Sequence, residues 1–195
     1  MTVINKKIKS LLKLEVFTSK DARKAGVPTG LVAYYVNKGI ITRLSRGLYR
    51  SSEIQSAAPF EWEDLLATSQ GIHLGTICVV SALSYYGLTL EVQRQFWIAV
   101  PHEMKAPRRK NTKIIRMRNF KLGRIGFELG EYKTFIYDKE RCVLDAFRFL
   151  SRESAIKVLK EYLKGTSDKK ADIPKLSKYA KTLRVDITPY LEALI

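Results

Sequence analysis

The chain has 195 residues, of which 46% are hydrophobic, so it can form one large or two small domains with cores of their own. Lys and Arg number 35 against 19 Asp and Glu, and the formal charge of +16 predicts attraction to a polyanion, either nucleic acid or an anionic membrane surface. The richest apolar run, "TICVVSALSYYGL" (76–88), is too short to cross a bilayer, which argues against a membrane protein.

The charge is unevenly distributed along the chain. Residues 1–52 carry 11 basic and 2 acidic side chains, so the N-terminal quarter is the first place to expect a nucleic-acid contact. Lysines interrupt the apolar part of the N-terminus, which is therefore not a secretory signal. Cys78 and Cys142 have no CxxC spacing and are expected as reduced core residues. These features indicate a cytoplasmic protein.

The first quarter of the chain predicts three short helices. "INKKIKSLLKLEVF" (4–17) has apolar residues at helical spacing. "TSKDARKAG" (18–26) begins with Thr18 as an N-cap, continues with Asp21 in an approximate capping box, and stops at Gly26. "VPTG" (27–30) predicts a turn, and "LVAYYVNKG" (31–39) a third helix. Two short helices around a tight turn are typical of a helix-turn-helix.

The third helix has two different sides. Val32, Tyr35 and Val36 are expected to face the other helices. The opposite side offers hydroxyl, amide, phenol and ammonium groups together with small residues, a surface suited to the major groove of DNA; it comprises Thr29, Gly30, Ala33, Tyr34, Asn37 and Lys38.

A predicted hairpin follows at once. "ITRLSRGLYR" (41–50) alternates, turns at "SRG", and contains three arginines and no acid. A hairpin directly after a helix-turn-helix predicts a winged helix, whose tip would present Arg46 to phosphate or the minor groove, flanked by Arg43 and Arg50. The alternative is a small helical domain with a solvated basic surface.

"SSEIQSAAPF" (51–60) reads as a linker, so we expect a winged helix-turn-helix domain at 1–52 and a second domain at 53–195. The second domain is expected to be mixed α and β with a helical tail, which makes the whole chain α+β. The predicted helices are 61–71, 76–88, 139–150, 153–165, 174–183 and 188–195, and the predicted strands are 94–101, 112–120, 125–129 and 132–138.

A second basic segment lies in this domain. Nine bases and no acid occur between Glu103 and Glu128, and this run is either a solvated surface or a second contact with DNA or RNA. Arg116 and Arg118 alternate along a predicted strand and should share one face. The candidate contacts are Lys105, Arg108, Arg109, Lys110, Arg116 and Arg118, and the remaining bases are Lys113, Lys121 and Arg124.

Little in the sequence favours an enzyme. There are only two histidines, and no phosphate-binding glycine motif occurs. Glu128, Glu131 and Lys133 resemble part of a metal-dependent nuclease site, but the preceding strands carry no further metal-binding acid. We therefore expect no catalytic residues, no metal and no cofactor. A nuclease-like enzyme and an RNA-binding module remain the alternative functions.

For the carboxylates near the start of the predicted helix at 139–150, we expect structural roles. Asp138 is simplest as an N-cap. Asp145 lies among apolar residues, so a salt bridge with Arg141 or Arg148 is its expected role.

Several segments in order resemble one family. These are "FTSKDARKAGVPTG", "VNKGIITRLSRGLYR", "ICVVSALSYYGLT", "FWIAVP" and "FIYDKERCVLDAFRF", and over residues 15–165 their order and spacing resemble the AbiEi antitoxins. These are the antitoxin and regulator components of type IV, abortive-infection toxin–antitoxin systems of phage defence. The family typically has threonine where this chain has Cys142, a conservative departure.

The resemblance implies a cytoplasmic antitoxin that represses its own promoter. It implies that the winged helix binds inverted repeats in double-stranded DNA, with two copies acting cooperatively. It also implies that the C-terminal domain opposes a nucleotidyltransferase-type toxin without a stable complex. The residues carried over to DNA binding are Thr29, Ala33, Tyr34, Asn37, Lys38, Arg43, Ser45, Arg46 and Arg50.

Overall fold

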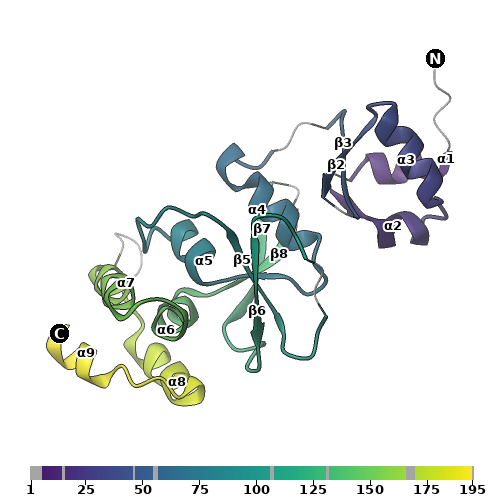
Figure 1. The fold of residues 1–195 in the computed structure, drawn as a ribbon. Coiled ribbons are helices and arrows are strands. Elements are labelled where there is room, and N and C mark those ends of the chain that lie inside the picture. Colours follow the sequence, from purple (N-terminus) through teal and green to yellow (C-terminus); the bar gives the residue numbers. More distant parts are fainter. Residues whose placement is uncertain are drawn as a thin grey trace. The chain divides into compact units, whose positions relative to one another are not determined.

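The computed structural model describes residues 6–14, 16–45, 47–54, 57–105, 108–130, 132–165 and 170–194. Their contacts form two compact units, and each is described by itself. The first comprises residues 1–75, 107–110 and 127–134, and the second the rest of the chain. Helices and sheets occur together, which confirms the expected α+β class (Figure 1).

The first unit begins with three short helices and a small sheet. Its elements are α1 (Lys6–Leu12), β1 (Phe17–Thr18), α2 (Ser19–Lys24), α3 (Thr29–Asn37), β2 (Ile41–Ser45), β3 (Leu48–Ser51) and α4 (Phe60–Gln70). The sheet is antiparallel, with strand order β1-β3-β2. The first three helices and the small sheet share an apolar cluster, formed by Ile8, Leu11, Leu12, Phe17, Ala22, Val27, Val32, Tyr35 and Ile41.

Three details of this unit differ from the sequence prediction. The first helix ends at Leu12, and Leu14 beyond it is 45% exposed. Phe17 and Thr18 form a strand paired with β3, which no local pattern predicts because only the distant partner makes two residues a strand. The third helix starts at Thr29, inside the predicted turn, since Pro28 fits the extended position just before a helix.

The second unit contains most of a five-stranded sheet and the C-terminal helices. Its strands are β4 (Thr76–Ile77), β5 (Phe96–Pro101), β6 (Thr112–Met117), β7 (Arg124–Leu129) and β8 (Tyr132–Tyr137), in the order β6-β5-β4-β8-β7. Strands β7 and β8 contribute residues to both units. Strand β5 runs antiparallel to β4 and parallel to β6, and β4 runs parallel to β8.

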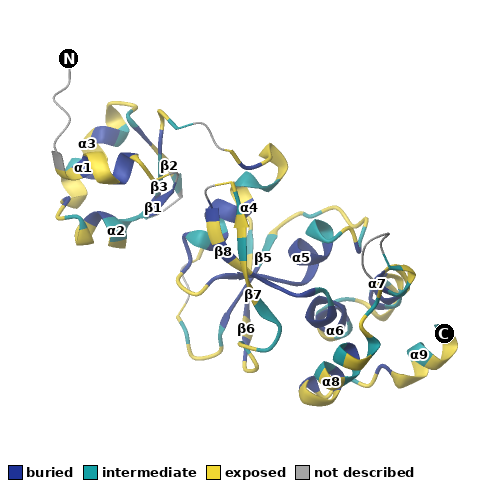
Figure 2. Ribbon diagram, turned by 180° about the vertical axis from the view of Figure 1, so that it is seen from behind, coloured by how far each residue is buried: buried dark blue, intermediate teal, exposed yellow. Residues whose placement is uncertain are grey.

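Helix α6 lies at the centre of the helical layer of this unit. The helices are α5 (Val79–Tyr85), α6 (Lys139–Phe149), α7 (Arg152–Lys164), α8 (Ile173–Leu183) and α9 (Thr188–Leu194). Helix α6 contacts α5, α7 and α8, and its residues from Glu140 to Ala146 are all buried. Figure 2 shows α5 and α6 largely dark blue, whereas α9 has no buried residue.

The predicted helices of this unit agree with the structure, except for the one predicted at 76–88. The predicted helix at 76–88 is shorter, because Thr76 and Ile77 form a strand and the helix covers Val79–Tyr85. All residues from Val79 to Leu83 of this helix are buried. Local hydrogen bonds explain the helix starts: the side chains of Asp138, Ser151 and Asp172 each accept from the backbone N–H three residues later.

Candidate nucleic-acid interface

Helix α3 presents a polar face to solvent. Val32 and Tyr35 are buried and Val36 is half-buried, as the sequence predicts for the inner side. The outer side is exposed along its whole length and consists of Thr29, Gly30, Ala33, Tyr34, Asn37 and Lys38. Gly39, with φ 70°, takes the left-handed conformation that ends the helix and starts the hairpin.

The outer side of α3 combines hydrogen-bonding groups with positive charge. The helix contains no acidic residue. Lys38 Nζ lies 5.8 Å from the centroid of the Tyr34 ring, and Tyr34 as a residue is 44% exposed. Amide, phenol and hydroxyl groups can bond to base edges, and the ammonium group attracts phosphate. Gly30 and Ala33 are small enough to let another backbone come close.

Helix α2 is held at a defined position before α3. Thr18 Oγ1 accepts from the Asp21 backbone N–H, and the Asp21 carboxylate accepts from the Thr18 backbone N–H at 2.8 Å. This is the predicted capping box, now with both hydrogen bonds. Gly26 has φ 68° and ends the helix as expected. Two short helices therefore meet around a four-residue connection, which is the spacing of a helix-turn-helix.

A short hairpin follows α3, as predicted. Strands β2 and β3 are antiparallel with Thr42 opposite Arg50 and Arg43 opposite Tyr49. Gly47 at the turn has φ 77°, and its carbonyl accepts from the Ser19 backbone N–H at 2.9 Å, which joins the turn to α2. Arg46 and the side chain of Ser45 lie outside the described residues.

The two described arginines of the hairpin differ in their surroundings. Arg43 is exposed. Arg50 is half-buried, and its Nη1 donates to Glu63 Oε1 of α4 in an ion pair. Successive residues of a strand point to opposite faces, so Arg43, opposite Tyr49, and Arg50, opposite Thr42, lie on different faces of the hairpin. The two arginines that the sequence predicts on either side of the hairpin tip therefore point to opposite faces of the sheet.

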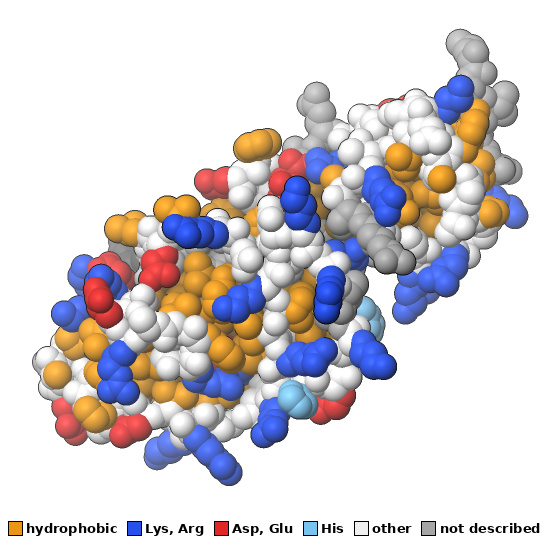
Figure 3. All heavy atoms as spheres, in the orientation of Figure 1, with side chains coloured by type: hydrophobic (Ala, Val, Ile, Leu, Met, Phe, Trp, Pro, Cys, Tyr) orange, Lys and Arg blue, Asp and Glu red, His pale blue; other side chains and the backbone are white. Residues whose placement is uncertain are grey.

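The second basic segment is divided between the two units. Residues 108–110 belong to the first, whereas Lys105, Arg116 and Arg118 belong to the second. Arg116 lies on β6 and Arg118 just beyond its end, and both are exposed. In Figure 3, Lys and Arg side chains are spread over the visible face of each unit. The exposed bases of the segment are Lys105, Arg108, Lys110, Lys113, Arg116, Arg118 and Lys121.

Two arginines of this segment have structural contacts. Arg109 Nη2 donates to the Gly71 carbonyl at 3.1 Å. Arg124 Nε donates to Thr76 Oγ1 at 2.8 Å, and its guanidinium lies 3.3 Å from the centroid of the Phe135 ring. Burial lowers the pKa of both guanidinium groups, which nevertheless stay charged at neutral pH. Both side chains therefore contribute to packing within their own unit.

Two of the three residues considered for a nuclease site, Glu128 and Lys133, form an exposed ion pair. Lys133 Nζ lies 3.5 Å from Glu128 Oε1, both side chains are well exposed, and Glu131 lies outside the described residues. Within the described ranges, no group of three His, Cys, Asp or Glu side chains is arranged to hold a metal ion.

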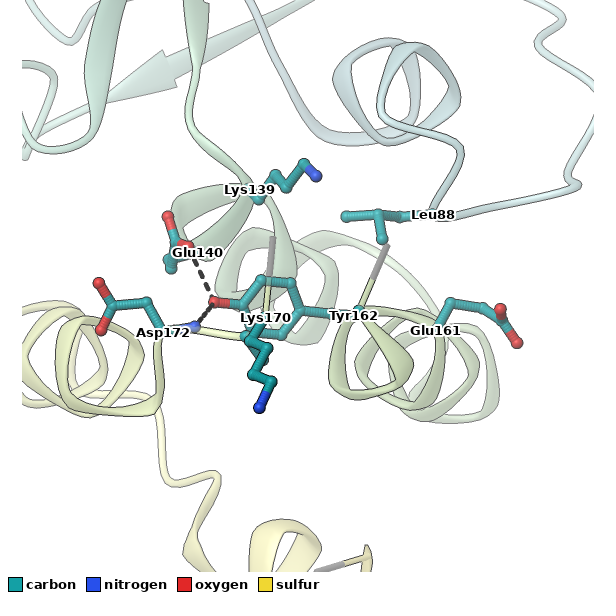
Figure 4. A pocket seen from close by; sticks show the side chains of 9 residues that line it. Leu88, Lys139, Glu140, Glu161, Tyr162, Lys170 and Asp172 are labelled. Carbon is teal, nitrogen blue, oxygen red and sulfur yellow. Dashed lines mark hydrogen bonds between the residues drawn. The ribbon is translucent and has the colours of Figure 1, made fainter. Parts of the chain in front are cut away.

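A cavity of about 290 Å³ in the second unit contains several charged groups (Figure 4). Tyr162 Oη donates to Glu140 Oε1 and accepts from the Asp172 backbone N–H, each at 2.8 Å. Lys175 Nζ lies 2.8 Å from Glu140 and 3.0 Å from Asp138. This network joins α6, α7 and α8, so its carboxylates have structural partners. The cavity is lined by Leu88, Lys139, Glu140, Glu161, Tyr162, Gly165, Lys170, Ala171 and Asp172.

Asp145 has the structural role that its position predicts. Arg141 Nε donates to one carboxylate oxygen at 2.9 Å and Arg148 Nη1 to the other at 2.6 Å. The side chains of Asp145 and Arg141 are both fully buried, so each charge requires the other as its partner.

Cys78 and Cys142 are buried free thiols, and burial raises the pKa of both. No helix in the described part of the chain is long and apolar enough to cross a membrane.

Sequence reasoning missed the contact between the hairpin and α4. Neither Glu63 nor Gly71 was a candidate, although both touch β3. Glu63 looks like an ordinary acid in the first turn of a helix, and only a tertiary contact pairs it with Arg50. Helical spacing gives a weak signal, because 63, 67 and 71 share one side of α4.

Comparison with known proteins finds a family match in the N-terminal part of the chain. Residues 7–52 match the family described as "Transcriptional regulator, AbiEi antitoxin". The match covers α1 through β3 and confirms the resemblance for this segment. No curated protein matches the chain.

Proposed function

We propose that this chain, which over residues 7–52 belongs to the family of AbiEi antitoxin transcriptional regulators, is a cytoplasmic antitoxin that represses its own promoter. In this proposal the first unit is a winged helix-turn-helix that binds inverted repeats in double-stranded promoter DNA, with two copies acting cooperatively. The toxin is of the nucleotidyltransferase type, is opposed by the C-terminal domain at 53–195 without a stable complex, and belongs to a phage-defence system.

The exposed face of α3 carries this proposal. It follows a capped α2 at helix-turn-helix spacing, lies directly before a hairpin, bears no acid, and falls within the matched segment. Asn37 and Tyr34 supply groups for base edges, and Lys38 a charge for phosphate. Thr29 and Ala33 lie on the same side of the helix and would line the groove. In the hairpin, Arg43 and the tip residues Ser45 and Arg46 would contact the sugar–phosphate backbone of the DNA.

Binding to the protein's own promoter tests the proposal. Wild-type protein is titrated against promoter DNA and a scrambled duplex of equal length at several salt concentrations. Asn37→Ala should reduce the preference for promoter DNA by about 1–3 kcal/mol, because a side chain bonded to a base edge recognises sequence. Binding to the scrambled duplex should change little.

Lys160→Ala, which removes an exposed lysine on α7, is the control and should leave both affinities unchanged. Equal affinity of the wild type for the two duplexes would refute the repressor function. Unchanged preference in Asn37→Ala, with the wild type specific, would refute the role of α3.

A further inference from the structure

The hairpin has two faces with different neighbours. The face of Arg43 and Tyr49 meets the helical core, since Tyr49 stacks on Phe17 with ring centroids 5.6 Å apart. The face of Leu48 and Arg50 meets α4 instead. Leu48 and Arg50 are two residues apart on one strand, so their side chains share that face.

Helix α4 fits closely against this second face. Leu48 is 1% exposed, and a Cβ added at Gly71 would overlap its methyl group. Ala67, one turn before Gly71, is buried. Glu63, one turn earlier again, carries the carboxylate that pairs with Arg50. One side of α4 therefore covers the hairpin from Leu48 to Arg50.

The Arg50 guanidinium is enclosed by this contact. The side chains of Arg50 and Glu63 are 21% and 13% exposed, and Arg50 Nε is buried away from solvent. If Arg50 turned to a phosphate, the largely buried Glu63 carboxylate would lose its cation. Leaving one member of a buried pair without its partner is costly, so the arrangement favours Arg50 staying with Glu63.

We propose that Arg50 does not contact DNA and that Glu63 is a positioning residue, which holds the hairpin against α4 through Arg50. This inference depends on one part of the proposed function, namely that the hairpin binds promoter DNA. Helix α4, which lies outside the matched segment, is then part of the DNA-binding module. The two arginines of the hairpin that the structure describes accordingly differ: Arg43 is exposed and can meet DNA, whereas Arg50 is held by the protein.

A charge swap in the full-length protein tests this assignment. Arg50→Glu should weaken promoter binding about tenfold or more, since two carboxylates then face each other and displace the hairpin. Adding Glu63→Arg should restore binding to within about threefold of wild type, with the wild-type salt dependence, because the pair is re-formed in reverse. Arg43→Glu should weaken binding comparably, and Glu63→Arg should not rescue it.

The opposite result would overturn the proposal. If Arg50 contacts phosphate, the swapped protein carries an acid against DNA and binds as weakly as Arg50→Glu alone. Should the swapped protein fail to fold, the single variant Glu63→Ala is compared with the double variant Arg50→Ala/Glu63→Ala. These two variants should have similar affinities for promoter DNA and a similar dependence of affinity on salt concentration. If the double variant loses a further phosphate contact, seen as a salt dependence shallower by about one charge, Arg50 does contact DNA.

Failure of the proposed function would look different. Wild-type protein would then show no preference for promoter DNA. The pairing itself is measured without DNA, by a double-mutant cycle of Arg50→Ala and Glu63→Ala in urea unfolding. Coupling between the two substitutions is expected, and strict additivity would refute the pairing.

Discussion

At the scale of single residues, Arg141 shows how the second unit accommodates a buried charge. Its guanidinium is fully buried, donates to Asp145, and also donates through Nη1 to the carbonyls of Asn119 and Leu122 at 2.8 and 2.9 Å. Burial raises the pKa of Asp145, while Arg141 and Arg148 oppose that effect. Because each buried charge depends on its partner, the pairing of these residues stabilises the folded state.

Glu140 leads to a prediction about pH. Burial raises its pKa, but hydrogen bonds from Lys175, the backbone and Tyr162 outweigh burial, so the pKa lies below its ordinary value. A carboxyl group with a lowered folded pKa stabilises the protein above its unfolded pKa, about 4.3. That stabilisation is lost as pH falls through the folded value.

We therefore expect Glu140→Gln to cost about 1–3 kcal/mol of unfolding free energy at pH 7, since hydrogen bonds to a charged group are lost. The difference from wild type should shrink below about pH 4.3. Urea unfolding between pH 7 and pH 3 measures it. Glu153→Gln, in an exposed pair with Lys157, is the control and should have little effect at any pH. A gap that stays constant with pH would contradict the assignment.

At the scale of elements, two glycines at helices should respond oppositely to the same substitution. Gly30 lies in the first turn of α3, and a Cβ there would meet no atom within 4 Å. Gly71 follows α4 with φ −72°, which suits alanine, but a Cβ there would overlap Leu48. Helix propensity dominates at the first position and steric overlap at the second.

Gly30→Ala should raise the unfolding free energy by up to about 1 kcal/mol, because alanine loses less backbone entropy in a helix. Gly71→Ala should lower it by about 1–3 kcal/mol, as expected for overpacking. Thermal and urea unfolding of the two variants, compared with wild type, give the signs. A neutral or stabilising Gly71→Ala would mean that α4 does not pack against the hairpin in solution.

At the scale of the whole molecule, the family match ends at residue 52 while the contacts of the first unit continue. That unit includes α4 and residues 127–134, which are joined through a 2.6 Å hydrogen bond between the Ser69 and Thr134 hydroxyls. Gln70 Oε1 also accepts from the Lys133 backbone N–H at 3.1 Å. Separating the two proposed activities is therefore better done by substitution than by cutting the chain.

The full-length variant Tyr34→Ala/Asn37→Ala should lose repression of its promoter and still neutralise the toxin. Both side chains are exposed on α3, so their removal leaves the second unit intact. A promoter reporter and growth of cells expressing the toxin measure the two activities separately. Lys160→Ala should retain both. Loss of neutralisation by the α3 variant, at normal protein levels, would contradict the proposed division of labour.

Much of this protein was determined by the sequence alone. Side-chain periodicity identified most helices and strands. The capping box of Thr18 and Asp21 was also predictable, because its two residues are three positions apart and depend on no distant part of the chain. The same periodicity selected the exposed side of α3, because the apolar residues that face the core leave only the opposite side for solvent. The buried pairing of Asp145 followed from the cost of an isolated charge.

Only the tertiary structure decided the rest. Two-residue strands such as β1 and β4 exist because a distant strand supplies hydrogen bonds, so no local pattern contains them. The partners of Arg50 and Arg109 come from α4 and from the residue that follows it, 13 and 38 positions away along the chain. The number of arginines in "ITRLSRGLYR" was therefore evident from the sequence. Which of them face solvent depended on the register of strands β2 and β3 and on helix α4, which covers one face of this hairpin.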